Sequence, residues 1–292
     1  MRAPEFMERQ AQMGILDYFD RMAIVHLPDR EDRFRALRAE LSRIGIDING
    51  PKVAVPDPPM PDDPNGYRSR GVFGSFLSHL EILEAAYRDG LETVWILEDD
   101  AIFSNRFGHE QEAVARYLRN NAWDMFFAGH SVWKALPDSP TSLLRFSGPF
   151  IWAHSYAVHR RILPRLIEFL HQTMERAVGH PEGGKLYIDA AYFFFRQANP
   201  DVICVVSSPC FSVQKGSRSS LNSGPWFEKY SPTRFALNLA REIRDESWRR
   251  GWLRIDGPQD CLMEGWNLTS SPAEIWPASM PDRAGNGEMA AS

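Results

Sequence analysis

Short apolar segments alternate with amphipathic helical patterns along the first half of the chain, and this alternation constrains the fold more than any other feature. Strands recur as short apolar runs, and helices place apolar residues three and four positions apart. Strand patterns cover 22–27, 52–55, 93–97 and 123–129, and helical patterns cover 29–45, 71–90 and 105–121. This order predicts an α/β domain with a largely parallel central sheet flanked by helices.

The second half of the chain alternates less regularly. It predicts strands over 150–158 and 201–208, a helix over 160–173 with Pro164 in its first turn, a helix beginning near Asp189, and a terminal helix over 231–251. We expect a single domain over 7–230, a C-terminal helix over 231–256, and a loop or disordered tail over 257–292. Residues 1–6 precede a second Met and are typical of an expression-vector remnant.

Composition excludes several classes of protein. The net charge of −5 over 292 residues disfavours a surface built to hold nucleic acid. Three cysteines at unrelated spacings fit neither a zinc site nor a disulfide framework, so we expect buried, reduced thiols. No apolar run reaches the roughly 18 residues that a membrane-spanning helix requires. We therefore expect a cytoplasmic chain.

Three carboxylates, Glu98, Asp99 and Asp100, directly follow the apolar strand pattern at 93–97. Ligands of such sheets bind beyond the carboxyl ends of the strands. Adjacent carboxylates repel one another when buried, unless a cation or strong donors neutralise them. Oxygen ligands alone favour Mg²⁺ or Mn²⁺. A plain structural role fits equally well, because Asp100 and Ser104 could both cap the following helix.

Several segments resemble glycosyltransferase family 25, which includes bacterial lipooligosaccharide galactosyltransferases and procollagen galactosyltransferases. Three blocks carry the resemblance in order and spacing: "IVHLPDREDR", "GVFGSFLSHLEIL" and "LEDDAIF". The later blocks "HSYAVHRRILPRLI", "LYIDAAY" and "SSPCFSVQKGSRSSL" extend it over about residues 22–222. The chain departs from the family at His26 and Ser75, where Asn and Cys are usual.

The resemblance implies a GT-A-like fold and inverting transfer of a sugar, usually galactose, from a UDP-sugar with Mn²⁺ or Mg²⁺ bound. The acceptor would be a hydroxyl of a glycan or lipid-linked saccharide, as in lipopolysaccharide biosynthesis. Glu98 and Asp100 resemble the outer carboxylates of the family's metal motif, and Asp99 between them would face the donor.

Further donor-binding candidates follow from their positions near these motifs. Arg30 and Arg33 leave the first strand, where guanidinium groups could meet phosphate or stack on a base, although a solvated helix start would look the same. Ser78 and His79 could support the acidic cluster or could be ordinary core residues. A loop over the donor is predicted after the last strand, with a polar surface turn as the alternative; its candidates are Gln214, Lys215 and Ser217, with Arg218 beside them.

Inverting transfer requires a carboxylate that accepts the proton of the attacking hydroxyl. Asp189 is the candidate, because the block "LYIDAAY" carries an Asp at this place in the family. An ordinary helix N-cap is an equal alternative for Asp189. Glu182 and Asp201 are weaker candidates.

The end of the predicted terminal helix carries Trp248, Arg249, Arg250, Trp252 and Arg254, a mixture that suits an anionic lipid surface. Packing on the main domain is favoured, and peripheral contact with the inner membrane face is the alternative. Two other functions remain open: a non-catalytic binder of nucleotide sugars or glycans, and a metal-dependent phosphohydrolase.

Overall fold

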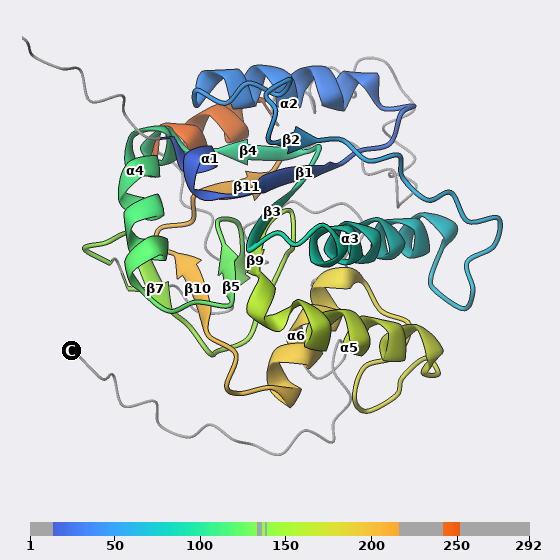
Figure 1. Ribbon diagram of the computed structural model, residues 1–292. Helices are drawn as coiled ribbons and strands as arrows, with labels where there is room; N and C mark the ends of the chain where they lie inside the picture. Colours follow the sequence, from blue (N-terminus) through green and yellow to red (C-terminus); the bar gives the residue numbers. More distant parts are fainter. Residues whose placement is uncertain (1–13, 133–135, 138, 216–241, 252–292) are drawn as a thin grey trace, which may run out of the picture.

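The computed structural model describes residues 14–132, 136–137, 139–215 and 242–251 (Figure 1). Its centre is a seven-stranded sheet in the order β2-β1-β3-β9-β5-β10-β7. Its strands are β1 (Arg21–Val25), β2 (Val53–Ala54), β3 (Thr93–Glu98), β5 (Met125–Phe127), β7 (Leu143–Arg145), β9 (Ser155–His159) and β10 (Cys204–Ser207). Only β9 and β7 run against the common direction. The predicted α/β class with a largely parallel sheet is confirmed.

Helices cover both faces of this sheet (Figure 1). On one face lie α3 (Arg70–Arg88), α5 (Leu163–Glu175) and α6 (Ile188–Ala198), and on the other lie α1 (Ile15–Tyr18), α2 (Glu31–Arg43) and α4 (Asn105–Asn120). Along β3 the side chains alternate between the two cores: Val94 and Ile96 enter the first, and Trp95 and Leu97 enter the second. Because both faces are covered, this strand is apolar throughout.

Local sequence signals explain where several helices begin. Ser69 caps α3 by accepting a hydrogen bond from the Val72 amide (3.2 Å), and Ser104 caps α4 through the Phe107 amide (3.2 Å). Pro164 lies in the first turn of α5, as predicted, where its missing N–H has no helical partner to lose. A short 3₁₀ turn, η1 (Arg160–Ile162), precedes α5.

Two local predictions were wrong. The strand predicted over 150–158 is two strands, β8 (Phe150–Ile151) and β9, because Trp152 adopts a positive φ of 80° between them. β8 pairs with β6 (Ser131–Val132) outside the central sheet. In α3, the spacing of Phe76, Leu80, Leu83 and Tyr87 predicts that they share one buried face, but Tyr87 does not join it, since it is 43% exposed.

A two-stranded antiparallel ribbon, which the sequence pattern did not predict, follows the acidic cluster. It consists of β4 (Ala101–Phe103) and β11 (Ser212–Gln214), paired from Ala101↔Gln214 to Phe103↔Ser212. We call this pair the β4–β11 ribbon. It joins the acidic cluster to a segment more than 100 residues later in the chain.

Of the predicted C-terminal helix, residues 242–249 are described and helical. This segment, orange-red in Figure 1, lies beside the β4–β11 ribbon, and its Trp248 packs with Ile102 and Val213. The remainder of 231–256 and the predicted tail lie outside the described residues. No helix among the described residues is long and apolar enough to cross a membrane.

Candidate active site

The acidic cluster lies at the carboxyl end of β3, beside the carboxyl end of β1. Glu98 is the last residue of β3, and Asp99 and Asp100 form the turn into β4. The Asp99 amide donates to the Val25 carbonyl (3.1 Å), and the Lys215 amide donates to the Asp100 carbonyl (2.6 Å). The cluster is therefore held from both sides, by the sheet and by the β4–β11 ribbon.

Arg33 pairs with two carboxylates of the cluster. Its Nη1 lies 3.0 Å from Asp99 Oδ1 and 3.1 Å from Asp100 Oδ2, and its side chain is 12% exposed. The other Asp99 oxygen contacts His26 Nδ1 at 2.8 Å. The other predicted arginine, Arg30, pairs with Asp32 at the start of α2 (3.0 Å). Among these contacts of the described residues, Arg33 is the arginine that pairs with the cluster.

The ionised form of Asp100 is disfavoured by its surroundings. Burial raises its pKa to about 7, and the charges of Glu98 and Asp99 act in the same direction, although Arg33 opposes them. Its Oδ1 is buried and has no hydrogen-bond partner among the described groups. Its place is not that of a helix cap, because Ser104 caps α4. A buried acceptor oxygen beside further carboxylates suits a hard cation.

The described residues do not form a complete metal cage. No group of three or more His, Cys, Asp or Glu side chains among them is arranged to hold an ion. Mg²⁺ and its relatives commonly use one or two carboxylates and complete their coordination with water and substrate phosphates. The pair Glu98 and Asp100 therefore fits a cation that is shared with a diphosphate.

Glu98 is held by side chains from two distant segments. Gln214 Nε2 donates to its Oε2 (3.1 Å), and His79 Nε2 lies 3.4 Å from its Oε1. Burial favours the neutral acid, but the contact with His79 and the charges around it leave the pKa of Glu98 lowered. Gln214 thus contacts the Glu98 carboxylate directly, while Lys215 donates its backbone amide to the Asp100 carbonyl. Ser217 lies outside the described residues.

His79 connects the cluster to a buried chain of hydroxyl groups. Its Nδ1 contacts the Tyr156 hydroxyl at 2.8 Å, which in turn lies 2.5 Å from the Tyr192 hydroxyl on α6. The histidine is fully buried, so it supports Glu98 from behind. Its neighbour Ser78 donates to the Gly74 carbonyl (2.9 Å) within α3.

A cavity of about 310 Å³ adjoins the cluster on the α3 side. It is enclosed by the end of β1, the segment after β2, and one face of α3. Its walls include Ile24, His26, Asp57, Pro58, Ser78 and Glu81. Because His26 also contacts Asp99, the cavity and the acidic cluster share one wall.

Asp189 is the second residue of α6, and the N-cap position belongs to Tyr187. Its carboxylate accepts hydrogen bonds from the Trp152 amide (3.2 Å) and the Ala190 amide (2.8 Å). Burial raises its pKa; these amides oppose the shift, and the charge of Glu98 adds to it. Asp189 therefore lies within electrostatic reach of the cluster without being the helix cap that the sequence also allowed.

The two weaker candidates for the catalytic carboxylate are engaged elsewhere. Glu182 pairs with Arg176 (3.0 Å) and Asp201 pairs with Arg165 (2.7 Å). Both carboxylate side chains are about two-thirds exposed, at 68% and 67%. The structure does not bring either of them to the acidic cluster.

Sequence reasoning missed His154, Tyr156 and Tyr192. His154 is fully buried, and its carbonyl accepts the Glu98 amide (2.8 Å), so it lies opposite the cluster across β3 and β9. Burial lowers the pKa of His154 to about 4. The later motif blocks contain all three residues, but their place at the cluster is created by tertiary structure: the antiparallel pairing of β9 with β3 brings His154 and Tyr156 there, and the packing of α6 brings Tyr192.

A glycosyltransferase identity emerges from comparison with known families. Residues 67–177, which include α3, β3 and the acidic cluster, match the family model described as glycosyltransferase family 25 (LPS biosynthesis protein). The match identifies the chain as a glycosyltransferase, and over these residues it confirms the resemblance to family 25 noted from the motifs. A search of curated proteins finds no significant match.

Solved structures give weaker similarities. A glycosyltransferase involved in glycosylation of the major capsid of PBCV-1 has 12% identity and a TM-score of 0.43, covering 76% of this chain and 99% of the other. Mannose-1-phosphate geranyltransferase from Thermus thermophilus has 12% identity and a TM-score of 0.36, covering 64% and 72%. A197 from STIV has 12% identity and a TM-score of 0.32, covering 68% and 95%.

Proposed function

We propose that the protein transfers a sugar, galactose by family resemblance, from a UDP-sugar to a hydroxyl of a glycan or lipid-linked saccharide, with inversion and with Mn²⁺ or Mg²⁺ bound. The observation that carries the proposal is the buried acidic cluster at the end of β3, in which an Asp100 oxygen has no hydrogen-bond partner among the described groups. Such a site favours a cation, and the reaction is inferred from the resemblance to glycosyltransferase family 25.

Glu98 and Asp100 would hold the cation, and its charge would offset the negative charge that develops on the leaving diphosphate. Arg33 compensates Asp99 and Asp100 in the free protein. Gln214 and His79 keep Glu98 oriented. The nucleoside would enter the cavity beside His26, whose volume of about 310 Å³ is within the usual range for small ligands.

Asp189 would accept the proton of the attacking hydroxyl. Its raised pKa favours this role, because a general base works best when its pKa approaches the operating pH. The two amide donors orient the carboxylate, so that one arrangement of its oxygens is maintained.

The deciding experiment measures UDP release from a panel of UDP-sugars, with and without saccharide acceptors, in Mn²⁺ and in EDTA. Transfer predicts UDP release that requires both an acceptor and a divalent cation. A non-catalytic binder releases no UDP. A phosphohydrolase cleaves the donor at a rate that no acceptor changes.

A further inference from the structure

Trp248 packs in one apolar cluster with residues of two segments, one of which supports the acidic cluster and the other Asp189. Only 5% of its surface is exposed, and it belongs to a small apolar cluster with Ile102, Val213 and Trp152. Ile102 and Val213 face each other in the β4–β11 ribbon. Trp152 belongs to the separate segment between β8 and β9.

The β4–β11 ribbon is the support of the acidic cluster. Gln214 donates its side-chain amide to Glu98 (3.1 Å), and the next backbone amide donates to the Asp100 carbonyl (2.6 Å). The terminal helix also holds this strand by a polar contact, because Arg244 Nη2 donates to the Gln214 carbonyl (3.3 Å). A shift of β11 would therefore move the donor to the Glu98 carboxylate and the donor that holds the backbone of Asp100.

Trp152 is the support of Asp189. Its amide donates to Asp189 Oδ2 (3.2 Å), and this direction depends on a backbone with φ of 80°. A bulky residue adopts positive φ only where its surroundings hold it there. Those surroundings include the apolar cluster to which Trp248 belongs and the ring of His154, which meets Trp152 edge to face at 5.7 Å.

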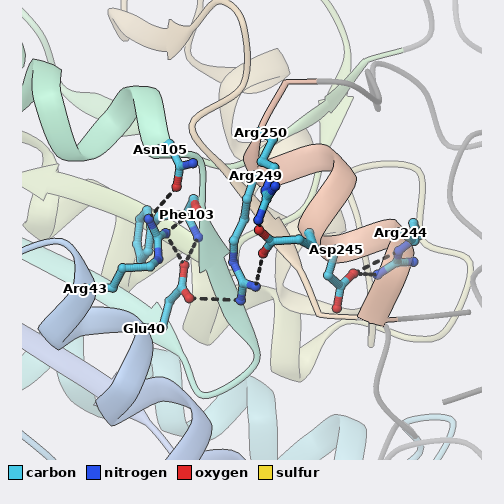
Figure 2. Close-up of polar contacts among 9 residues, drawn as sticks. Glu40, Arg43, Phe103, Asn105, Arg244, Asp245, Arg249 and Arg250 are labelled. Atoms are coloured by element: carbon cyan, nitrogen blue, oxygen red, sulfur yellow. Dashed lines mark hydrogen bonds and ion pairs between the residues drawn. The ribbon is translucent and has the colours of Figure 1, made fainter. Parts of the chain in front are cut away.

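A buried carboxylate anchors the terminal helix at this place (Figure 2). Arg249 Nη2 donates to Glu40 Oε2 (3.0 Å), while Glu40 Oε1 accepts hydrogen bonds from the Phe103 amide (2.7 Å) and from Arg43 (2.6 Å). Glu40 is only 5% exposed. It thus links α2, the ribbon and the terminal helix, which fixes how Trp248 enters its cluster.

We infer that Trp248 is a positioning residue that keeps the acidic cluster and Asp189 in register with one another. The inference rests on the proposed function, in which these carboxylates act on the donor and acceptor. The terminal helix would then affect the reaction rate as well as stability. Small displacements of reacting groups can lower a rate by about 10²-fold.

The test compares Trp248→Ala with Trp248→Phe and with Leu118→Ala. Leu118 is buried near the far end of α4, away from Ser104 and the ribbon, so its truncation loosens the core without touching the site. Trp248→Ala should lower kcat by about tenfold to a hundredfold, with the KM for the donor changed by less than about threefold. Trp248→Phe should recover most of the rate, and Leu118→Ala should retain it at a similar loss of stability.

Hydrogen exchange followed by mass spectrometry gives a readout that does not depend on activity. Amides of 100–103 and 212–215 should exchange at least about tenfold faster in Trp248→Ala than in the wild type. Their exchange rates should be unchanged in Leu118→Ala. If Trp248→Ala does not fold, Arg249→Met removes the Glu40 anchor and should have the same two effects.

Two results would overturn the inference: exchange in the ribbon that stays at the wild-type rate, or a loss of kcat that Leu118→Ala reproduces. Failure of the proposed function looks different. In that case the wild-type protein transfers no sugar, while the exchange of the ribbon still reports whether Trp248 holds it.

Discussion

Replacing Asp100 by Asn should make the metal-free protein more stable. In the free protein this carboxylate is buried beside Glu98 and Asp99, and its pKa is raised to about 7, chiefly by burial. The amide carries no charge and still offers an oxygen to Arg33, which now lies 3.1 Å from Asp100 Oδ2. The substitution therefore removes electrostatic repulsion while keeping a hydrogen-bond acceptor.

The size of the effect follows from the shift of the pKa from 3.8 to about 7. The folded state holds the proton more tightly, so folding loses stability as pH rises between these values. Above pH 7 the ionised carboxylate costs about 4 kcal/mol, at about 1.4 kcal/mol per pKa unit. Asp100→Asn removes this cost, but burying the amide costs part of the free energy that is recovered. We therefore expect the variant to gain at least about 1 kcal/mol in free energy of unfolding at pH 8.

Urea unfolding in EDTA at pH 8 and at pH 4 measures this gain. The difference between Asp100→Asn and wild type should be present at pH 8 and nearly absent at pH 4, where the wild-type carboxyl is protonated. Asp201→Asn is the matched control, because its side chain is 67% exposed and paired with Arg165. Saturating Mn²⁺, at about 100 times its Kd, should stabilise wild type by about 2.7 kcal/mol and the variant far less.

The reasoning is refuted if Asp100→Asn is less stable than wild type at pH 8 in EDTA. It also fails if the gain is the same at both pH values, because the charge would then not be its source. Equal stabilisation of both proteins by Mn²⁺ would remove Asp100 from the proposed cation site.

Three further predictions test the remaining groups. Asp189→Asn should lower kcat by roughly 10²-fold or more, with UDP affinity by calorimetry unchanged, while Asp201→Asn keeps its rate; normal transfer by the first variant would exclude it as the base. Asp100→Ala should abolish Mn²⁺-dependent transfer, and Glu98→Gln should reduce it less; the reverse order would reassign the two roles. The His130 pKa is lowered to about 4 by burial, so stability should fall by about 3 kcal/mol between pH 6.5 and 4, and His130→Gln should flatten that dependence in urea unfolding.

Contact between the C-terminal helix and a membrane stays a prediction. Trp248 and Arg249 are turned toward the protein, the first into an apolar cluster and the second toward Glu40. They contribute to the fold and not to an outward basic and aromatic surface. Trp252 and Arg254 lie outside the described residues.

The sequence by itself determined the architecture around β3. The apolar run at 93–97, the helix ahead of it and the caps at Ser69 and Ser104 are local patterns, because periodicity and hydrogen-bonding side chains act within a few residues of their own position. The same locality placed three carboxylates at the end of a strand. A buried strand in an α/β sheet ends where ligands bind, so the position of the cluster was predictable.

Only the tertiary structure decided which groups surround those carboxylates. Arg33 pairs with the cluster while Arg30 pairs with Asp32, although both lie at the start of one helix. Gln214 meets Glu98 from 116 residues away, and Trp248 enters its cluster beside Trp152. These contacts depend on strand pairing and on helix orientation across the whole domain. A local sequence pattern does not predict strand pairing or helix orientation across the domain. The free energy that selects these arrangements comes from burial shared among distant segments.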